Sequence, residues 1–194
     1  MKPAAKIAFN ECALTGIVFD GRFSPLRLYI EDDKVVMDLS NRNKSQAIFI
    51  DPDIRLLNEI IANKRKLPKA FKGKLPQDFK AQIIALYTKK TYEGLSFMLK
   101  AKQAVIGRRA IDRALLGHTE KEPLAVLQTP EGSEAICNNF KFKQQSLRVI
   151  KDFSQEMLQK VSGREKISYY CILNTEMGNI FVNDYMKYLK IIAQ

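Results

Sequence analysis

Residues 103–107 read Gln-Ala-Val-Ile-Gly, and they mark a change from a short apolar run to a helical pattern. Residues 103–106 have the length and composition of a buried strand, and after Gly107 the apolar residues Ile111 and Leu115 follow at helical spacing. The same succession is expected three more times, with strands at 124–127, 147–150 and 168–173 and helices at 131–140, 154–161 and 177–192. Strands that alternate with helices predict a layered α/β fold for this half.

The first half has a different pattern, with three short strands expected before any helix. These strands cover residues 26–30, 34–39 and 47–50, and the polar residues 31–33 form a turn between the first two. Asp51 followed by Pro52 is typical of a helix start, so a helix is expected from there to about Asn63.

A second helix is expected to begin near Asp78, and the polar residues 89–91 then separate it from a fresh helical pattern through Met98. We interpret this polar stretch as a linker. The sequence therefore predicts two domains, residues 1–89 and residues 90–194.

Composition limits the class of partner. The chain has 194 residues, 46% of them apolar, and a net charge of +11. It is therefore expected to be globular, with an anionic partner such as nucleic acid, a membrane surface or an acidic protein. No apolar run is long enough to span a membrane, and the N-terminus lacks the apolar core of a secretion signal. Of the three anionic partners, nucleic acid is expected and a membrane is not.

The residues that usually carry catalysis are sparse. Cys12, Cys137 and Cys171 form no CxxC pair and no disulfide framework, which indicates a reducing, cytoplasmic setting. His118 is the single histidine, and no phosphate-binding loop or metal-ligand spacing is present. The sequence predicts neither an enzyme nor a bound cofactor or metal.

Residues 64–74 form the densest basic cluster, which we call the basic run. Six of its eleven residues are basic and none is acidic. Phosphates attract such a surface because binding releases their condensed counterions. The alternative is an ordinary solvated loop, and for Phe71 within the run a core role is favoured over stacking on a base. The candidate phosphate ligands of the run are Lys64, Arg65, Lys66, Lys69, Lys72 and Lys74.

The first half resembles the YlxR family of small bacterial proteins. The resemblance rests on the Cys-Ala-Leu-Thr-Gly segment at 12–16, on Arg27, on the Asp-Leu pair at 38–39 and on the basic run. Where the family has Gly-Arg-Gly-Ala, residues 45–48 read Ser-Gln-Ala-Ile, so the nucleic-acid cleft implied by the resemblance is expected to be altered or lost. Arg42 and Lys44 lie nearby in the sequence and are the residues expected to compensate.

The second half resembles the bacterial relatives of the kink-turn-binding ribosomal proteins. Residues 95–107 follow the family's typical stretch, and residues 163–167, Gly-Arg-Glu-Lys-Ile, resemble an element before its last strand. The two resemblances in this order match a bacterial fusion of both types. They imply an α+β first domain and a three-layer α/β/α second domain.

In the kink-turn binders RNA meets the start of the helix after the first strand, which here begins at Gly107. The family's Asn-Glu pair is replaced by Arg109 and Ala110, so RNA binding by charge and shape is expected. Arginines at a helix start oppose the helix dipole, which itself suggests a function. The expected ligands are Gly107, Arg108, Arg109 and Arg113.

The sequence thus predicts a non-catalytic protein that binds structured RNA through two basic surfaces and serves translation or RNA metabolism. Two alternatives remain open. One is a DNA-binding transcriptional regulator, since a basic surface does not select a duplex type. The other is a degenerate module that docks on a ribosome or another ribonucleoprotein, which the two altered family motifs favour.

Overall fold

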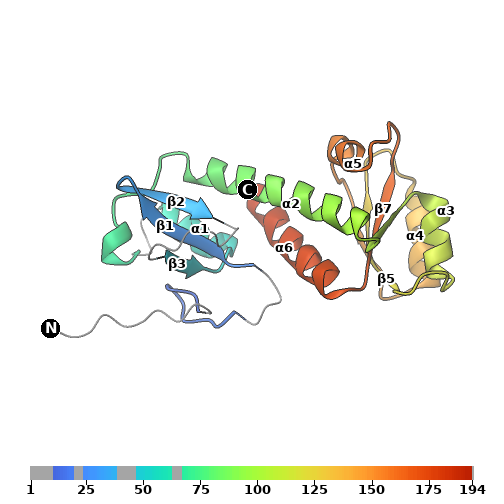
Figure 1. Ribbon diagram of the computed structural model, residues 1–194, viewed down its shortest axis with the longest axis horizontal. Helices are drawn as coiled ribbons and strands as arrows, with labels where there is room; N and C mark the ends of the chain where they lie inside the picture. The colour runs from blue at the N-terminus through green and yellow to red at the C-terminus, as the bar shows by residue number, and fades with distance from the viewer. Residues whose placement is uncertain (1–10, 20–23, 39–46, 63–66, 194) are drawn as a thin grey trace. The chain divides into compact units, whose positions relative to one another are not determined.

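The structure is a computed structural model that describes residues 11–19, 24–38, 47–62 and 67–193. It contains helices and two separate sheets, so the α/β fold expected from the sequence is confirmed (Figure 1). By its internal contacts the chain forms two compact units. Unit 1 comprises Met1–Lys90 with Asn183–Gln194, and unit 2 comprises Thr91–Val182.

Unit 1 is built on a three-stranded antiparallel sheet with the strand order β2-β1-β3. Its first turn is tight because Asp32 and Asp33 both adopt positive φ angles, 47° and 61°, a conformation that short hairpins favour. The register places Arg27 opposite Phe49 on one neighbouring strand. The elements that lie wholly in this unit are β1 (Leu26–Glu31), β2 (Lys34–Asp38), β3 (Ala47–Ile50), α1 (Ile54–Ile61) and the 3-10 helix η1 (Lys69–Phe71).

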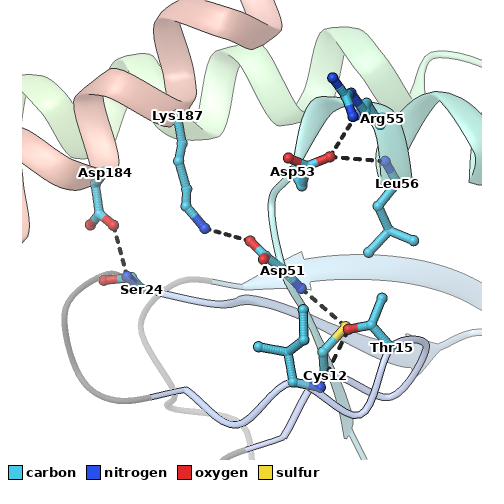
Figure 2. A network of polar contacts seen from close by, with 10 residues as sticks. Cys12, Thr15, Ser24, Asp51, Asp53, Arg55, Leu56, Asp184 and Lys187 are labelled. Carbon is cyan, nitrogen blue, oxygen red and sulfur yellow. Dashed lines mark hydrogen bonds and ion pairs between the residues drawn. The ribbon is translucent and has the colours of Figure 1, made fainter.

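Helix α1 begins two residues later than the Asp-Pro pair predicted. Asp53 is the N-cap, and its side chain accepts hydrogen bonds from the backbone N–H groups of Arg55 and Leu56 (Figure 2). Asp51 has another role, because its carboxylate pairs with Lys187. The sequence offered two aspartates at suitable positions, and the ion pair explains why the first does not cap the helix.

Helix α2 (Phe79–Lys100) is continuous, so the predicted linker at residues 89–91 is wrong. Lysine is a good helix former, and residues 89–91 contain no glycine or proline that would favour the end of a helix. Lys90 pairs with Asp184, and Thr91 is buried. The boundary between the two units falls within this helix.

The last residues of the chain belong to unit 1 rather than to the second domain, which was expected to extend to residue 194. They form the end of α6 (Glu176–Ile192). Asp184 is 5% exposed, pairs with Lys90 and accepts a hydrogen bond of 2.7 Å from the backbone N–H of Ser24. The rings of Tyr87 and Tyr188 stack with centroids 6.0 Å apart. These contacts, part of which Figure 2 shows, join residues far apart in sequence.

Unit 2 contains a four-stranded sheet with the strand order β4-β7-β5-β6. Strand β7 runs antiparallel to β4 and β5, and β6 runs parallel to β5. It follows that β4, β5 and β6 all point the same way. The elements that lie wholly in this unit are β4 (Ala104–Ile106), α3 (Arg108–Leu115), β5 (Pro123–Gln128), α4 (Glu134–Lys143), β6 (Arg148–Ile150), α5 (Gln155–Ser162) and β7 (Tyr169–Leu173).

Helices cover both faces of this sheet. Helices α3 and α4 lie side by side on one face, and α5 lies on the other (Figure 1). On the first face Ile111 and Phe140 pack with alternate strand residues, including Val126 and Cys171. On the second face the Tyr170 hydroxyl donates a 2.7 Å hydrogen bond to the Leu95 carbonyl of α2. Unit 2 is therefore a three-layer α/β/α structure.

Among the described residues, no helix has both the length and the apolar composition needed to cross a membrane.

Replacement of Asp184 by alanine is expected to lower the free energy of unfolding by about 2 kcal/mol, because a buried hydrogen-bonded charge is lost and Lys90 loses its partner. Urea unfolding of the full chain measures this effect. Glu120→Ala, which removes an exposed loop carboxylate, serves as the control and should change stability by less than about 0.5 kcal/mol. Equal effects from both variants would show that the end of α6 does not stabilise the fold.

Candidate nucleic-acid interface

The described part of the basic run surrounds a buried phenylalanine. Phe71 is 5% exposed and ends the 3-10 helix η1, while Lys69 and Lys72 on either side of it are exposed. Phe71 therefore has the core role that the sequence favoured. No carboxylate lies within ion-pair distance of Lys69 or Lys72 among the residues that the structure describes, so both ammonium groups face solvent.

Lys74 differs from these two lysines, because its Nζ atom lies 2.7 Å from the Asp33 carboxylate. Its backbone carbonyl accepts a hydrogen bond from the N–H of Val35, which ties the end of the run to β2. The remaining predicted ligands of unit 1, namely Arg42, Lys44, Lys64, Arg65 and Lys66, lie outside the described residues.

In unit 2 three helices begin at one edge of the sheet. Strands β4, β5 and β6 are parallel, and α3, α4 and α5 follow their carboxyl ends. This is the edge at which ligands bind in open α/β sheets. Helices α4 and α5 have acidic residues in their first turns, Glu134 and Glu156, whereas α3 has none.

Helix α3 begins at a position that only glycine adopts readily. Gly107, its N-cap, has φ 85° and ψ 155°, and no side chain caps the helix. Its own N–H donates to the Tyr169 carbonyl at 3.0 Å. Arg108 and Arg109 occupy the first two helical positions, both exposed, where they add positive charge to the positive end of the helix.

The three arginines of α3 have different environments. Arg108 lies 3.7 Å from Asp112, and Lys143 of α4 reaches the same carboxylate at 2.6 Å. Arg109 and Arg113 are exposed and have no carboxylate partner among the described residues. The structure thus places all four predicted ligands, Gly107 included, in one short segment, and two of them carry uncompensated charge.

Hydrogen bonds hold the loop before α4 against the same edge. The Gln128 amide donates to the Gly132 carbonyl at 2.6 Å, and the Tyr169 hydroxyl donates to the Ser133 carbonyl at 3.2 Å. A Cβ atom on Gly132 would lie 2.7 Å from the Gln128 side chain and 3.0 Å from a backbone oxygen, so this close packing requires glycine. The edge is therefore a fixed surface.

Sequence reasoning missed one exposed aromatic residue on α4, the helix next to α3. Phe142 is 87% exposed and lies in the last turn of α4. The predicted helix ended at Phe140, so the sequence did not place Phe142 on a helix surface. Its position between Lys141 and Lys143 is the signal that would have identified it.

The cysteine and histidine side chains of the described chain lie in different environments. Cys12, Cys137 and Cys171 are buried free thiols. Burial raises the pKa of the Cys137 thiol, and it raises the pKa of Cys171 to about 12. His118 is exposed in the loop after α3. Among residues 11–19, 24–38, 47–62 and 67–193, no group of three or more His, Cys, Asp or Glu side chains is placed to hold a metal ion.

Comparisons with known proteins add no family to this description, because no family model and no curated protein matches the chain. The two family resemblances therefore stay predictions, and the function is argued from the residues of the site.

Gly107→Asn is expected to lower the free energy of unfolding by about 1–3 kcal/mol, because φ 85° with ψ 155° is a conformation that asparagine avoids. A Cβ atom there would meet no neighbour within 4 Å, so the cost is one of backbone strain alone. Gly163→Asn is the matched control, since φ 68° and ψ 17° is the left-handed conformation that asparagine accepts. Similar losses in chemical unfolding for both variants would contradict the assigned backbone geometry.

The Cys171 thiol is expected to resist alkylation at pH 8 in the folded protein and to react after unfolding in urea, because the folded pKa is about 12 and the ordinary value is 9.0. The raised pKa favours the folded state below pH 9, and this contribution is lost as the pH rises towards 12. Mass spectrometry of iodoacetamide-treated protein measures the reaction. Rapid labelling of Cys171 without urea would show that the strand is not buried as described.

Proposed function

We propose that this protein is a non-catalytic RNA-binding protein that holds the phosphates of structured RNA, with a role in translation or RNA metabolism. The observation that carries the proposal is the pair of exposed arginines on α3, Arg109 and Arg113, which have no carboxylate partner in the described chain. Arg109 lies in the first turn of α3, after the glycine N-cap at the ligand-binding edge of the α/β sheet, and Arg113 lies in the last turn of the same helix.

The electrostatics of the α3 start support an anionic ligand. Two arginines add to the positive helix terminus, so the local arrangement costs stability until an anion neutralises it. Guanidinium groups suit phosphate oxygens because their fork of N–H donors forms paired hydrogen bonds. Arg108 already pairs with Asp112, so Arg109 and Arg113 are the stronger candidates for phosphate binding.

Lys69 and Lys72 form the second basic surface of the proposal. Both are exposed and flank the buried anchor Phe71. A single lysine contributes little at physiological salt, but two surfaces on one RNA raise the affinity through effective concentration. Lys74 contributes less to this surface, because Asp33 neutralises its charge.

The burial of the three cysteine thiols and the exposure of the histidine support a binding role rather than covalent catalysis. Free thiols also fit a reducing cytoplasmic setting, which is part of the proposal.

The double variant Arg109→Ala/Arg113→Ala is expected to weaken binding to total cellular RNA and to flatten the slope of log affinity against log salt by about one unit per arginine. Lys69→Ala and Lys72→Ala should each act in the same way. Filter binding at several salt concentrations measures both quantities. Lys121→Ala/Lys166→Ala removes two exposed cations outside these surfaces and is the matched control.

Three outcomes would reject the proposal or redirect it. Unchanged affinity and slope in the arginine variant would show that α3 does not contact phosphates. Preference for duplex DNA at every salt concentration would favour the transcriptional regulator. Capture on ribosomes that survives nuclease treatment, without RNA binding by the purified protein, would favour the docking module.

A further inference from the structure

Phe142 is not needed for the core of unit 2. Helix α4 already contributes Cys137 and Phe140 to that core, and the Phe140 ring packs edge-on against Tyr169 with centroids 5.8 Å apart. Phe142 points away from these contacts and is 87% exposed. A second exposed apolar residue, Leu116, lies at the end of α3 and is 66% exposed. The outer surface of the two helices therefore presents apolar side chains that the fold does not use.

The exposed residues of α3 and α4 lie on two neighbouring helices. Residues 109, 113 and 116 are spaced as one stripe of a helix, and so are residues 135, 138, 139 and 142. The Lys143–Asp112 ion pair joins the two helices, which lie side by side (Figure 1). We call this surface the α3–α4 face and define it by Arg109, Arg113, Leu116, Asn138, Asn139 and Phe142.

The side chains of α3 and α4 that have no ion-pair partner in the described chain are all positively charged. The two helices carry five basic side chains and two acidic ones, Asp112 and Glu134. Asp112 is paired with Arg108 and Lys143, and Glu134 is paired with Lys151. Arg109, Arg113 and Lys141 have no carboxylate partner in the described chain. The partner of this face must therefore be anionic.

The same partner must also use a flat apolar ring and two uncharged amides. Unpaired nucleotides meet both requirements, because each has a phosphate, a planar face that stacks on aromatic side chains and edges that exchange hydrogen bonds. An acidic peptide would engage the arginines but would leave the ring and the amides without matching groups. The combination of side chains thus favours single-stranded nucleic acid over an acidic protein.

We propose that the α3–α4 face binds an unpaired segment of RNA, with a base stacked on Phe142 and the flanking phosphates held by Arg109 and Arg113. Asn138 and Asn139 supply hydrogen bonds to base edges. This inference rests on the proposed RNA-binding function and deepens it. It extends the contact from the start of α3 to the last turn of α4 and names single-stranded RNA as the ligand class.

Binding of the full chain to a short oligouridylate, compared with an RNA duplex of the same length, tests the proposal. Phe142→Ala is expected to weaken oligouridylate binding by roughly 5- to 100-fold, the range for loss of one base–aromatic stack, and to leave duplex binding nearly unchanged. Phe97→Ala is the matched control, because Phe97 is also exposed, at 51%, but lies on α2. It should bind both probes as the unaltered protein does.

A second variant detects the stacking of a base on residue 142 directly. The chain contains no tryptophan, so Phe142→Trp introduces a single tryptophan, whose emission is distinguished from that of the seven tyrosines. Oligouridylate should quench its fluorescence while the affinity is retained, because a larger aromatic ring still stacks. The corresponding Phe97→Trp variant should bind without quenching. Thermal unfolding of each variant shows whether the fold is kept, and exposed positions are expected to tolerate these changes.

The outcomes separate this inference from the proposed function. If the unaltered protein binds RNA but Phe142→Ala binds oligouridylate equally well, or the tryptophan is not quenched, the stacking site is overturned and RNA binding stands. Equal losses for the oligouridylate and the duplex would also overturn it. If the unaltered protein binds neither probe, both proposals fail. Quenching by polyglutamate but not by oligouridylate would overturn it in favour of an acidic protein partner.

Discussion

The antiparallel insertion of β7 between β4 and β5 is the constraint on which the arrangement of unit 2 depends. All five residues of β7 are buried, and Tyr170, Cys171 and Ile172 have no exposed surface. A strand so completely buried pairs on both edges and packs on both faces, which leaves a single register. Its neighbours β4 and β5 consequently run parallel, and the helices that follow them begin at one edge.

This arrangement fixes the start of α3, where the proposed binding residues begin. The Tyr169 carbonyl at the beginning of β7 accepts the N–H of Gly107, and the Tyr169 hydroxyl holds the Ser133 carbonyl of the neighbouring loop. One residue of the central strand thus positions two helix starts. Arginines at the first turn of α3 oppose the dipole, and the rigid edge keeps them there without a local carboxylate for Arg109.

The charge distribution separates cations that pair with carboxylates from cations that face solvent. Lys90, Lys143 and Lys187 pair with Asp184, Asp112 and Asp51, and the first and last of these pairs help to hold unit 1 together. Arg109, Arg113, Lys69 and Lys72 have no such partners among the described residues. A net charge of +11 therefore does not describe an evenly basic surface, because part of it serves the fold and part of it faces solvent.

Local signals in the sequence determined most of the elements. Ser154 was expected to cap α5, and its hydroxyl accepts the Met157 N–H at 3.2 Å, while the turn at residues 31–33 and the helix start at Gly107 also occur where predicted. Such features depend on a few neighbouring residues, so their residue types suffice. The arginines of α3 were predicted as ligands from the resemblance to the kink-turn binders, and that role stays a prediction.

Only the tertiary structure decided features that depend on distant residues. Asp53 rather than Asp51 caps α1, since Asp51 pairs with Lys187. Helix α2 is continuous, and its Lys90 pairs with Asp184 of α6. Both pairs involve the last residues of the chain, which belong to unit 1. Phe140 is buried and Phe142 is exposed because one side of α4 packs against the sheet and the other side faces solvent. Contacts across many residues carry no local signal, so the sequence alone leaves them undetermined.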